Sequence, residues 1–103
     1  MRDGELFMDD LKIFQGKADL LKALAHPTRL CIVNGLMREE GCNVNRIREC
    51  LSLPQSTVSQ QLAILRAAGV VAGERHGTEV CYRVIDERAK AIVTVLMGTT
   101  PSD

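Results

Sequence analysis

The sequence predicts a mainly α fold with a small antiparallel β-hairpin, built as one domain over residues 1–103. Apolar residues recur every three or four positions through most of the first 68 residues, which is the period of helices with one buried face. Two segments rich in β-branched residues, 70–75 and 79–84, then flank the turn-forming residues 76–78, as in a hairpin. Helical periodicity returns over residues 87–97.

The first half of the chain is predicted to form helices over residues 5–24, 27–37 and 44–51. In the first of these, Phe7, Leu11 and Phe14 fall at i, i+4 and i+7, and leucines continue the apolar stripe to its end. The second begins at Pro27, because proline is tolerated in the first turn of a helix and is disfavoured further in.

The second half is predicted to contain a fourth helix, the hairpin and a last helix. Pro54 marks the start of the fourth helix, which ends near Ala68 because Gly69 supplies a C-terminal stop. The hairpin covers residues 70–84. On the last helix, residues 87–97, one face carries Ala89, Ile92, Val93 and Leu96.

The fourth helix has an unusual surface. Val58, Leu62 and Leu65 cluster on the side that faces the core, and the opposite side is polar with almost no charge. Short hydroxyl and amide groups fit the major groove of DNA and exchange hydrogen bonds with base edges and phosphates. The alternative is a polar face without a partner, although serine and threonine are poor choices inside a helix. The polar side chains are Gln55, Ser56, Thr57, Ser59 and Gln60.

The tip of the predicted hairpin is a second candidate DNA-binding element. Arg75, His76 and Thr78 supply a cation, a titratable ring and a hydroxyl around Gly77, directly after the two short helices. A tip of this kind reaches the adjacent minor groove or the phosphate backbone. Read alone, it is also compatible with an ordinary hairpin turn.

Four segments resemble the ArsR/SmtB family of bacterial winged helix-turn-helix repressors. They are Leu-Ala-His-Pro-Thr-Arg-Leu at 24–30, Leu-Pro-Gln-Ser-Thr-Val-Ser-Gln-Gln-Leu at 53–62, Leu-Arg-Ala-Ala-Gly-Val-Val at 65–71, and Arg-His-Gly-Thr-Glu-Val-Cys-Tyr-Arg-Val at 75–84. The resemblance covers roughly residues 18–97. It implies a winged helix-turn-helix (ααααββα) that works as a homodimer, with the helix-turn-helix at about 44–68 and the wing at about 70–84.

The resemblance also implies a function and the residues that carry it. We expect a sequence-specific regulator of transcription that binds double-stranded DNA at a two-fold-related operator and represses. Many family members have histidines where this chain has Gln60-Gln61, so sequence preference is expected to shift while binding survives. The family's DNA-contacting positions fall on Gln55, Ser56, Thr57, Ser59, Gln60, Arg75, His76 and Thr78.

The terminal helices, about 5–24 and 87–97, are the expected dimerisation elements. Their apolar stripes could complete the core of a monomer, but the middle helices and the sheet already supply one, and the surplus favours a dimer. The residues expected at this interface are Phe7, Leu11, Phe14, Ile92, Val93 and Leu96.

The charge of the chain is balanced, with 13 Lys+Arg against 13 Asp+Glu. DNA-binding domains are usually basic, so the balance argues against that function. The acidic residues, however, gather mainly outside residues 52–83. We therefore expect moderate affinity for DNA that falls steeply with salt.

The four cysteines are scattered without a Cys-x-x-Cys pair and are expected to be reduced thiols. Cys31, Cys50 and Cys81 are expected to pack as small core residues. Cys42 is the candidate reactive thiol, because it lies near a helix start, where a thiol pKa can be lowered. No convergent set of zinc ligands can be assembled, and no cofactor is expected. Metal or redox sensing through Cys42, and any other effector, stay open.

Other functions are less well supported by the sequence. It contains no G-x-S-x-G, no phosphate-binding glycine loop and no H-E-x-x-H, so an enzyme is not expected. A winged-helix domain that binds only proteins is the main alternative, although such a surface is expected to expose aromatic or large apolar anchors. The absence of a long apolar run and of an N-terminal signal core predicts a cytoplasmic protein with no membrane partner.

Overall fold

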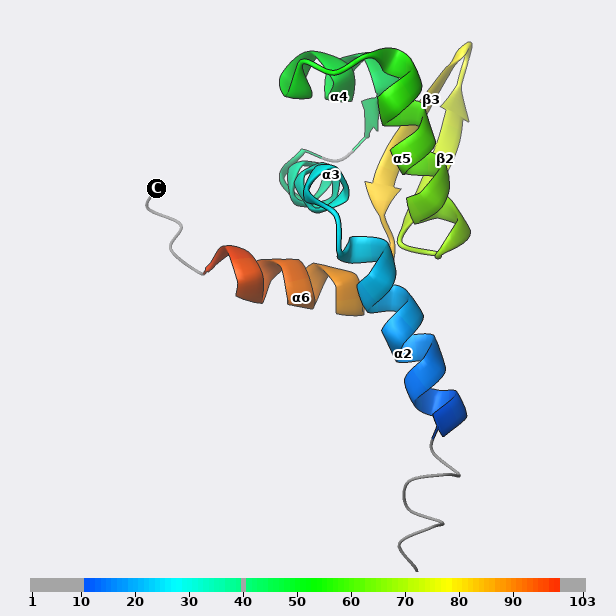
Figure 1. Cartoon of the computed structure of the whole chain (residues 1–103). Helices are drawn as coiled ribbons and strands as arrows, with labels where there is room; N and C mark the ends of the chain where they lie inside the picture. The colour runs from blue at the N-terminus through cyan, green and yellow to red at the C-terminus, as the bar shows by residue number, and fades with distance from the viewer. Residues whose placement is uncertain (1–10, 40, 99–103) are drawn as a thin grey trace, which may run out of the picture.

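The computed structural model describes residues 11–39 and 41–98. The helices and strands follow the predicted order, and their positions are drawn in Figure 1. In chain order they are α2 (Leu11–Leu24), α3 (Pro27–Arg38), β1 (Cys42–Asn43), α4 (Val44–Leu51), α5 (Gln55–Ala67), β2 (Val71–His76), β3 (Glu79–Val84) and α6 (Glu87–Met97).

The sheet has one strand more than the sequence predicted. The predicted hairpin is β2 and β3, which pair antiparallel from Val71 opposite Val84 to His76 opposite Glu79. The additional strand β1 pairs antiparallel with the other edge of β3, so that the strand order is β1-β3-β2. A strand of two residues is too short to show the alternation by which strands are recognised in a sequence.

Side-chain caps explain where three of the helices begin. His26 precedes α3, and its Nδ1 accepts a hydrogen bond from the backbone N–H of Thr28 at 3.1 Å. Asn43 caps α4 by accepting from the N–H of Arg46 at 2.8 Å. Asp86 caps α6 by accepting from two backbone N–H groups, at 2.8 and 3.0 Å. Each cap satisfies an N–H group that has no partner within its helix.

The turn between α4 and α5 is compact. Helix α4 ends at Leu51. The next residue, Ser52, lies in the left-handed region with φ of 57°, and its N–H donates to the carbonyl of Arg48. Pro54 then precedes α5, and its carbonyl accepts from the N–H groups of Thr57 and Val58. This turn fixes the two helices as one helix-turn-helix unit.

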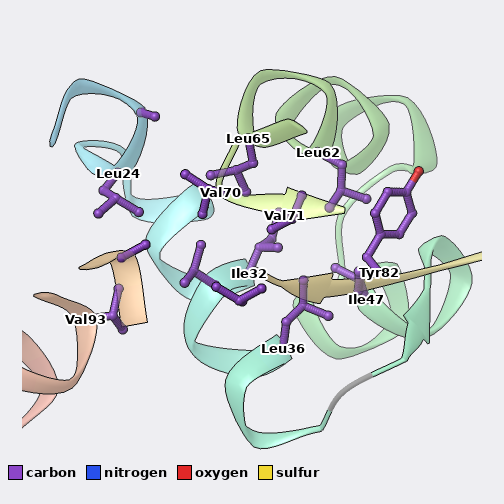
Figure 2. Close-up of a cluster of buried hydrophobic side chains, with 14 of the residues drawn as sticks. Leu24, Ile32, Leu36, Ile47, Leu62, Leu65, Val70, Val71, Tyr82 and Val93 are labelled. Carbon is purple, nitrogen blue, oxygen red and sulfur yellow. The ribbon is translucent and has the colours of Figure 1, made fainter. Parts of the chain in front are cut away.

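The core lies where α3, α5 and the sheet meet, and Figure 2 shows its side chains converging from these elements. Val58, Leu62 and Leu65 of α5 are buried, as their helical spacing predicted. On α3, Ile32, Val33 and Leu36 are buried, whereas Leu30 and Met37 are only partly covered. The core therefore anchors α5 by one face and leaves its other face outward.

One predicted dimerisation residue belongs to this core. Val93 of α6 is only 1% exposed and lies with Leu24 and the α3 side chains in the buried cluster (Figure 2). It has almost no surface left for a partner, so its assignment to a dimer interface was wrong. The helical stripe that suggested it is divided, since Ala89 and Val93 face the core while Leu96 is exposed.

Candidate nucleic-acid interface

The polar face of α5 is exposed, as expected for a surface that meets a partner. Gln55, Ser56, Ser59 and Gln60 are exposed and Thr57 is half-buried, while the apolar residues of the helix face inward. The first turn contains no acidic residue, and no side chain caps the helix. The partial positive charge of this N-terminus therefore faces outward without a carboxylate to neutralise it, which favours a phosphate group.

The wing, defined as the β2–β3 hairpin, extends beside the N-terminal end of α5 (Figure 1). Its turn is possible because Gly77 adopts a φ of +67°. Arg75, His76 and Thr78 are all exposed around this turn. His76 Nε2 lies 3.7 Å from a carboxylate oxygen of Glu74, so a protonated His76 forms an exposed ion pair there.

A pocket of about 230 Å³ joins the wing to the start of α5. Gln55 of α5 and Thr78 of the wing both line it, together with Asn45 of α4 and Glu79 of β3. Two predicted DNA-binding residues that lie far apart in the sequence are thus brought to one hollow. Asn45 had not been identified as a site residue, because only the tertiary arrangement places α4 next to the wing.

Hydrogen bonds from Arg29, which the sequence did not reveal, hold α5 in position. Arg29 of α3 donates from Nη1 to the side-chain oxygen of Gln61 at 2.7 Å and from Nε to the carbonyl of Ala23 at 2.6 Å. Gln61 is half-buried, so it faces α3, whereas Gln60 beside it is exposed. The two adjacent glutamines therefore have different surroundings. The signal that could have found Arg29 is a cation three and four residues before the buried Ile32 and Val33, and so on the inward side of α3.

The surroundings of Cys42 do not fit the expected reactive thiol. Its Sγ donates to the backbone carbonyl of Glu39 at 3.0 Å, and burial and the nearby Glu39 carboxylate raise the pKa of the thiol. The prediction of a lowered pKa was wrong, because burial of the thiol and the nearby Glu39 carboxylate outweigh the effect of the start of α4. Cys31 and Cys50 are exposed and so do not pack in the core as expected, and Cys81 is half-buried.

Ion pairs near the helix starts account for the other altered pKa values. Arg46 donates two hydrogen bonds of 3.0 Å to the Glu39 carboxylate, which lowers the pKa of Glu39 and raises that of Arg46. Arg88 likewise lowers the pKa of Asp86, the cap of α6. Within residues 11–39 and 41–98, no three His, Cys, Asp or Glu side chains are arranged to hold a metal ion.

A separate apolar surface covers α2 and α6, which lie at the end of the molecule opposite the wing tip (Figure 1). Leu11 and Phe14 on α2 and Leu96 on α6 are exposed by 65%, 56% and 64%. Ile92 is half-buried against the core and also lines an apolar hollow on α6 with Leu96. Phe7 lies outside the described residues. None of the helices described has the length and apolar character that crossing a membrane requires.

Comparisons with known proteins agree with this architecture. A family model described as a helix-turn-helix domain matches residues 24–74. The "HTH-type transcriptional repressor SmtB" of Mycobacterium tuberculosis is 46% identical over 82 residues, which is 80% of this chain and 60% of that protein. This chain thus spans about 60% of the length of that relative. The "Transcriptional repressor PagR" of Bacillus anthracis is 43% identical over 79 residues, 77% of this chain and 79% of that one.

Solved structures show the same relationship. The crystal structure of PagR superposes with a TM-score of 0.77 at 40% identity, over 84% of this chain and 98% of that one. The solution structure of the homodimeric winged helix-turn-helix domain of Mb0332 from Mycobacterium bovis, a possible ArsR-family regulator, gives a TM-score of 0.76 at 27% identity, over 85% and 81%. With this fold and these relatives, the chain belongs to the ArsR/SmtB family of winged helix-turn-helix transcriptional repressors.

Proposed function

We propose that this protein is a sequence-specific repressor that binds double-stranded DNA as a homodimer and acts in the cytoplasm. The observation that carries the proposal is the exposed, uncharged polar face of α5 beside the wing. Its side chains are short or flexible and offer both donors and acceptors, which is what reading base edges requires. The names of SmtB and PagR as transcriptional repressors support the same function. This function needs no catalytic group, in keeping with a family of repressors.

The two parts of the surface have different roles in this proposal. Ser59 and Gln60 on α5 meet base edges in the major groove, and Gln60 is suited to a bidentate contact with adenine. Gln55, Ser56 and Thr57, at the start of α5, meet the adjoining phosphates or bases. In the wing, Arg75, His76 and Thr78 reach the backbone or the neighbouring minor groove.

Dimerisation is proposed to occur through α2 and α6. Their exposed apolar side chains, Leu11, Phe14 and Leu96, form a surface that an isolated protomer would leave in water. The homodimeric state of the Mb0332 domain supports this arrangement. A two-fold dimer presents two copies of α5, and the matching operator has two-fold-related half-sites about one helical turn apart.

The first test measures binding by fluorescence anisotropy on DNA from upstream of the protein's own gene and on scrambled DNA, across a salt series. We expect tighter binding to the upstream DNA at every salt concentration. Equal and weak binding to both DNAs, with a folded dimeric protein and several operators tried, would instead favour a domain that binds only proteins. In that case the affinity for both DNAs would disappear as salt rises.

Two substitutions separate base reading from phosphate binding. Gln60→Ala is expected to cost about 1–3 kcal/mol on the upstream DNA and to relax the preference at one base position. Arg75→Ala is expected to weaken binding to both DNAs and to reduce the slope of log affinity against log salt by about 1. Gln15→Ala and Arg38→Ala, which make the same changes on exposed parts of α2 and α3, are the matched controls. A Gln60→Ala protein with unchanged affinity and preference would remove Gln60 from the interface.

A further inference from the structure

A pocket of about 270 Å³ lies between α3 and α4, and its lining comes from these helices and the segment that connects them. Its apolar floor includes Ile32 and Leu36 of α3 and Ile47 of α4, which are also core residues. The volume exceeds that of a cavity of about 150 Å³ that holds benzene. It is slightly below the range of about 300–1,000 Å³ typical of sites for drug-sized ligands. The pocket therefore fits a small apolar molecule with about one ring.

Three of the four cysteines of the chain line this pocket. Cys31 comes from α3, Cys42 from β1 and Cys50 from α4, so the fold gathers thiols from three elements. Cys31 and Cys50 are exposed, while Cys42 is half-buried. A thiol reacts as a nucleophile through its thiolate sulfur, so this pocket brings three potential nucleophiles to one apolar space.

Gly35 is an independent sign that this space is kept open. It lies in the middle of α3, where glycine is less favourable than alanine, and it lines the pocket. A Cβ atom at this position would meet no other atom within 4 Å, so close packing inside the chain does not require a glycine there. The helix thus carries an unfavourable residue at a point where a side chain would narrow the pocket from α3.

The local charges distinguish Cys50 from Cys42. The Cys42 thiol is engaged with the carbonyl of Glu39, and its raised pKa keeps it protonated. Arg46 lies one turn before Cys50 on α4, so the two side chains share one side of the helix, and both line the pocket. Glu39, which pairs with Arg46, and Arg38 are the other charged residues of the lining. Cys50 is therefore exposed and lies on the side of α4 that carries a positive charge.

We propose that the pocket between α3 and α4 binds a small apolar α,β-unsaturated carbonyl compound and that Cys50 adds to it. The thiolate sulfur donates an electron pair to the β-carbon, forming a C–S bond. The π electrons of the C=C bond move to the α-carbon and the carbonyl oxygen, and the α-carbon takes a proton from water. No group leaves, and the addition needs no oxidant or reductant.

The test compares two maleimides with the same reactive ring, N-ethylmaleimide and the more polar N-(2-hydroxyethyl)maleimide. The full chain is treated with each, and the adduct at every cysteine is followed by peptide mass spectrometry. At Cys50 we expect the rate of adduct formation to favour the ethyl compound about fourfold more in the folded protein than in the urea-unfolded chain, as follows if burying the additional hydroxyl costs about 0.8 kcal/mol. The same preference in folded and unfolded chains would overturn the proposal.

Substitutions at Gly35 test the pocket without removing a thiol. Gly35→Leu fills the space and is expected to abolish the preference at Cys50, whereas Gly35→Ala, the matched control, retains most of it. Cys81 on β3, outside the pocket, serves as the internal reference. Circular dichroism establishes that each variant is folded, and the comparison with urea stands even if Gly35→Leu does not fold. Retention of the preference in a folded Gly35→Leu protein, or addition at Cys31 in place of Cys50, would overturn the assignment.

An adduct in this pocket is expected to alter DNA affinity, because α4 packs directly against α5. This regulatory step rests on the proposed function, whereas adduct formation does not. The chain labelled with N-ethylmaleimide at Cys50 is expected to bind the upstream DNA at least about threefold more weakly than the unlabelled chain, a shift of about 0.65 kcal/mol. Unchanged affinity would overturn the regulatory step alone.

Discussion

At the scale of single residues, Arg29 links the proposed DNA-reading helix to the rest of the molecule. Its guanidinium donates to the side chain of Gln61 on α5 and to the carbonyl of Ala23 at the end of α2. These are charge-assisted hydrogen bonds in a partly buried setting, where they are stronger than bonds between neutral groups. Arg29 thereby fixes the position of α5 relative to α2 and α3.

Arg29→Leu is therefore expected to lower the free energy of unfolding by about 1.5–3 kcal/mol, the usual contribution of a hydrogen bond to a charged group. Urea denaturation of Arg29→Leu, Gln61→Leu and the double variant measures how much of this loss belongs to the pair. We expect the sum of the losses of unfolding free energy in the two single variants to exceed the loss in the double variant by about 1 kcal/mol. Strictly additive losses would mean that Arg29 acts through Ala23 and not through Gln61.

Residue positions that depend on helical periodicity were predictable, and those that depend on tertiary contacts were not. The spacing of Val58, Leu62 and Leu65 identified the buried face of α5, because one helix alone determines that face. The pKa of Cys42 depends on burial of the thiol and on the carboxylate of Glu39, and both follow from the fold. No sequence pattern contains that information.

At the scale of elements, Asp86 determines where α6 begins. Its carboxylate accepts from the N–H groups of Arg88 and Ala89 and forms an ion pair with the Arg88 side chain. The hydrogen bond from Arg88 is the main reason why the pKa of Asp86 is lowered. Since α6 both covers the core through Val93 and carries exposed Leu96, a weakened start of this helix affects both surfaces.

Asp86→Ala is expected to reduce the free energy of unfolding by about 1 kcal/mol at neutral pH, the usual cost of losing an N-cap. Asp86→Asn keeps an oxygen that caps the helix and loses only the charge. Because the pKa of Asp86 is lower in the folded state than in the unfolded state, its charge contributes stability above the unfolded pKa of about 3.9. That contribution disappears as the pH falls through the folded pKa.

Urea unfolding of the native chain and the Asn variant from pH 7 to pH 2 checks this dependence. The difference in the free energy of unfolding between the two proteins should be constant above about pH 5 and should shrink below about pH 4. A difference that persists undiminished at pH 2 would show that Asp86 acts only as a neutral hydrogen-bond acceptor.

Among the elements, those with a long periodic pattern were predicted within a few residues. Helix α4 was expected at residues 44–51 and is found there, and the two strands of the wing lie within the expected 70–84. Strand β1 was not expected, because its two residues pair with Cys81 and Tyr82, which lie almost 40 positions later in the chain. A pairing between such distant residues leaves no mark on the local pattern.

At the scale of the whole molecule, two surfaces with different chemistry lie at opposite ends. The polar face of α5 and the wing form one, and the exposed apolar residues of α2 and α6 form the other. Figure 1 shows the wing tip and the helices α2 and α6 at opposite ends. This separation allows two protomers to associate through their apolar ends while both polar ends stay accessible. The sequence predicted the two surfaces but not which apolar residues the protomer keeps for its own core, because that division depends on how α6 packs on α3.

Leu96 and Val93 make that division testable, since they lie on the same helix and differ in exposure, 64% against 1%. Leu96→Asp places a charge on the exposed apolar surface and is expected to shift the protein from dimer to monomer at micromolar concentration, as measured by size-exclusion chromatography with light scattering. Because a monomer engages only one half-site, the affinity for the full operator should fall at least about 100-fold, as expected when two linked contacts become one.

Val93→Ala is expected to affect stability and not association. The cavity that it leaves lowers the free energy of unfolding by about 2 kcal/mol, while the folded protein stays dimeric. A Leu96→Asp protein that remains dimeric with unchanged affinity would place the dimer contact elsewhere on the chain. A folded Val93→Ala protein that becomes monomeric would mean that the packing of α6 on the core and the association of protomers cannot be separated.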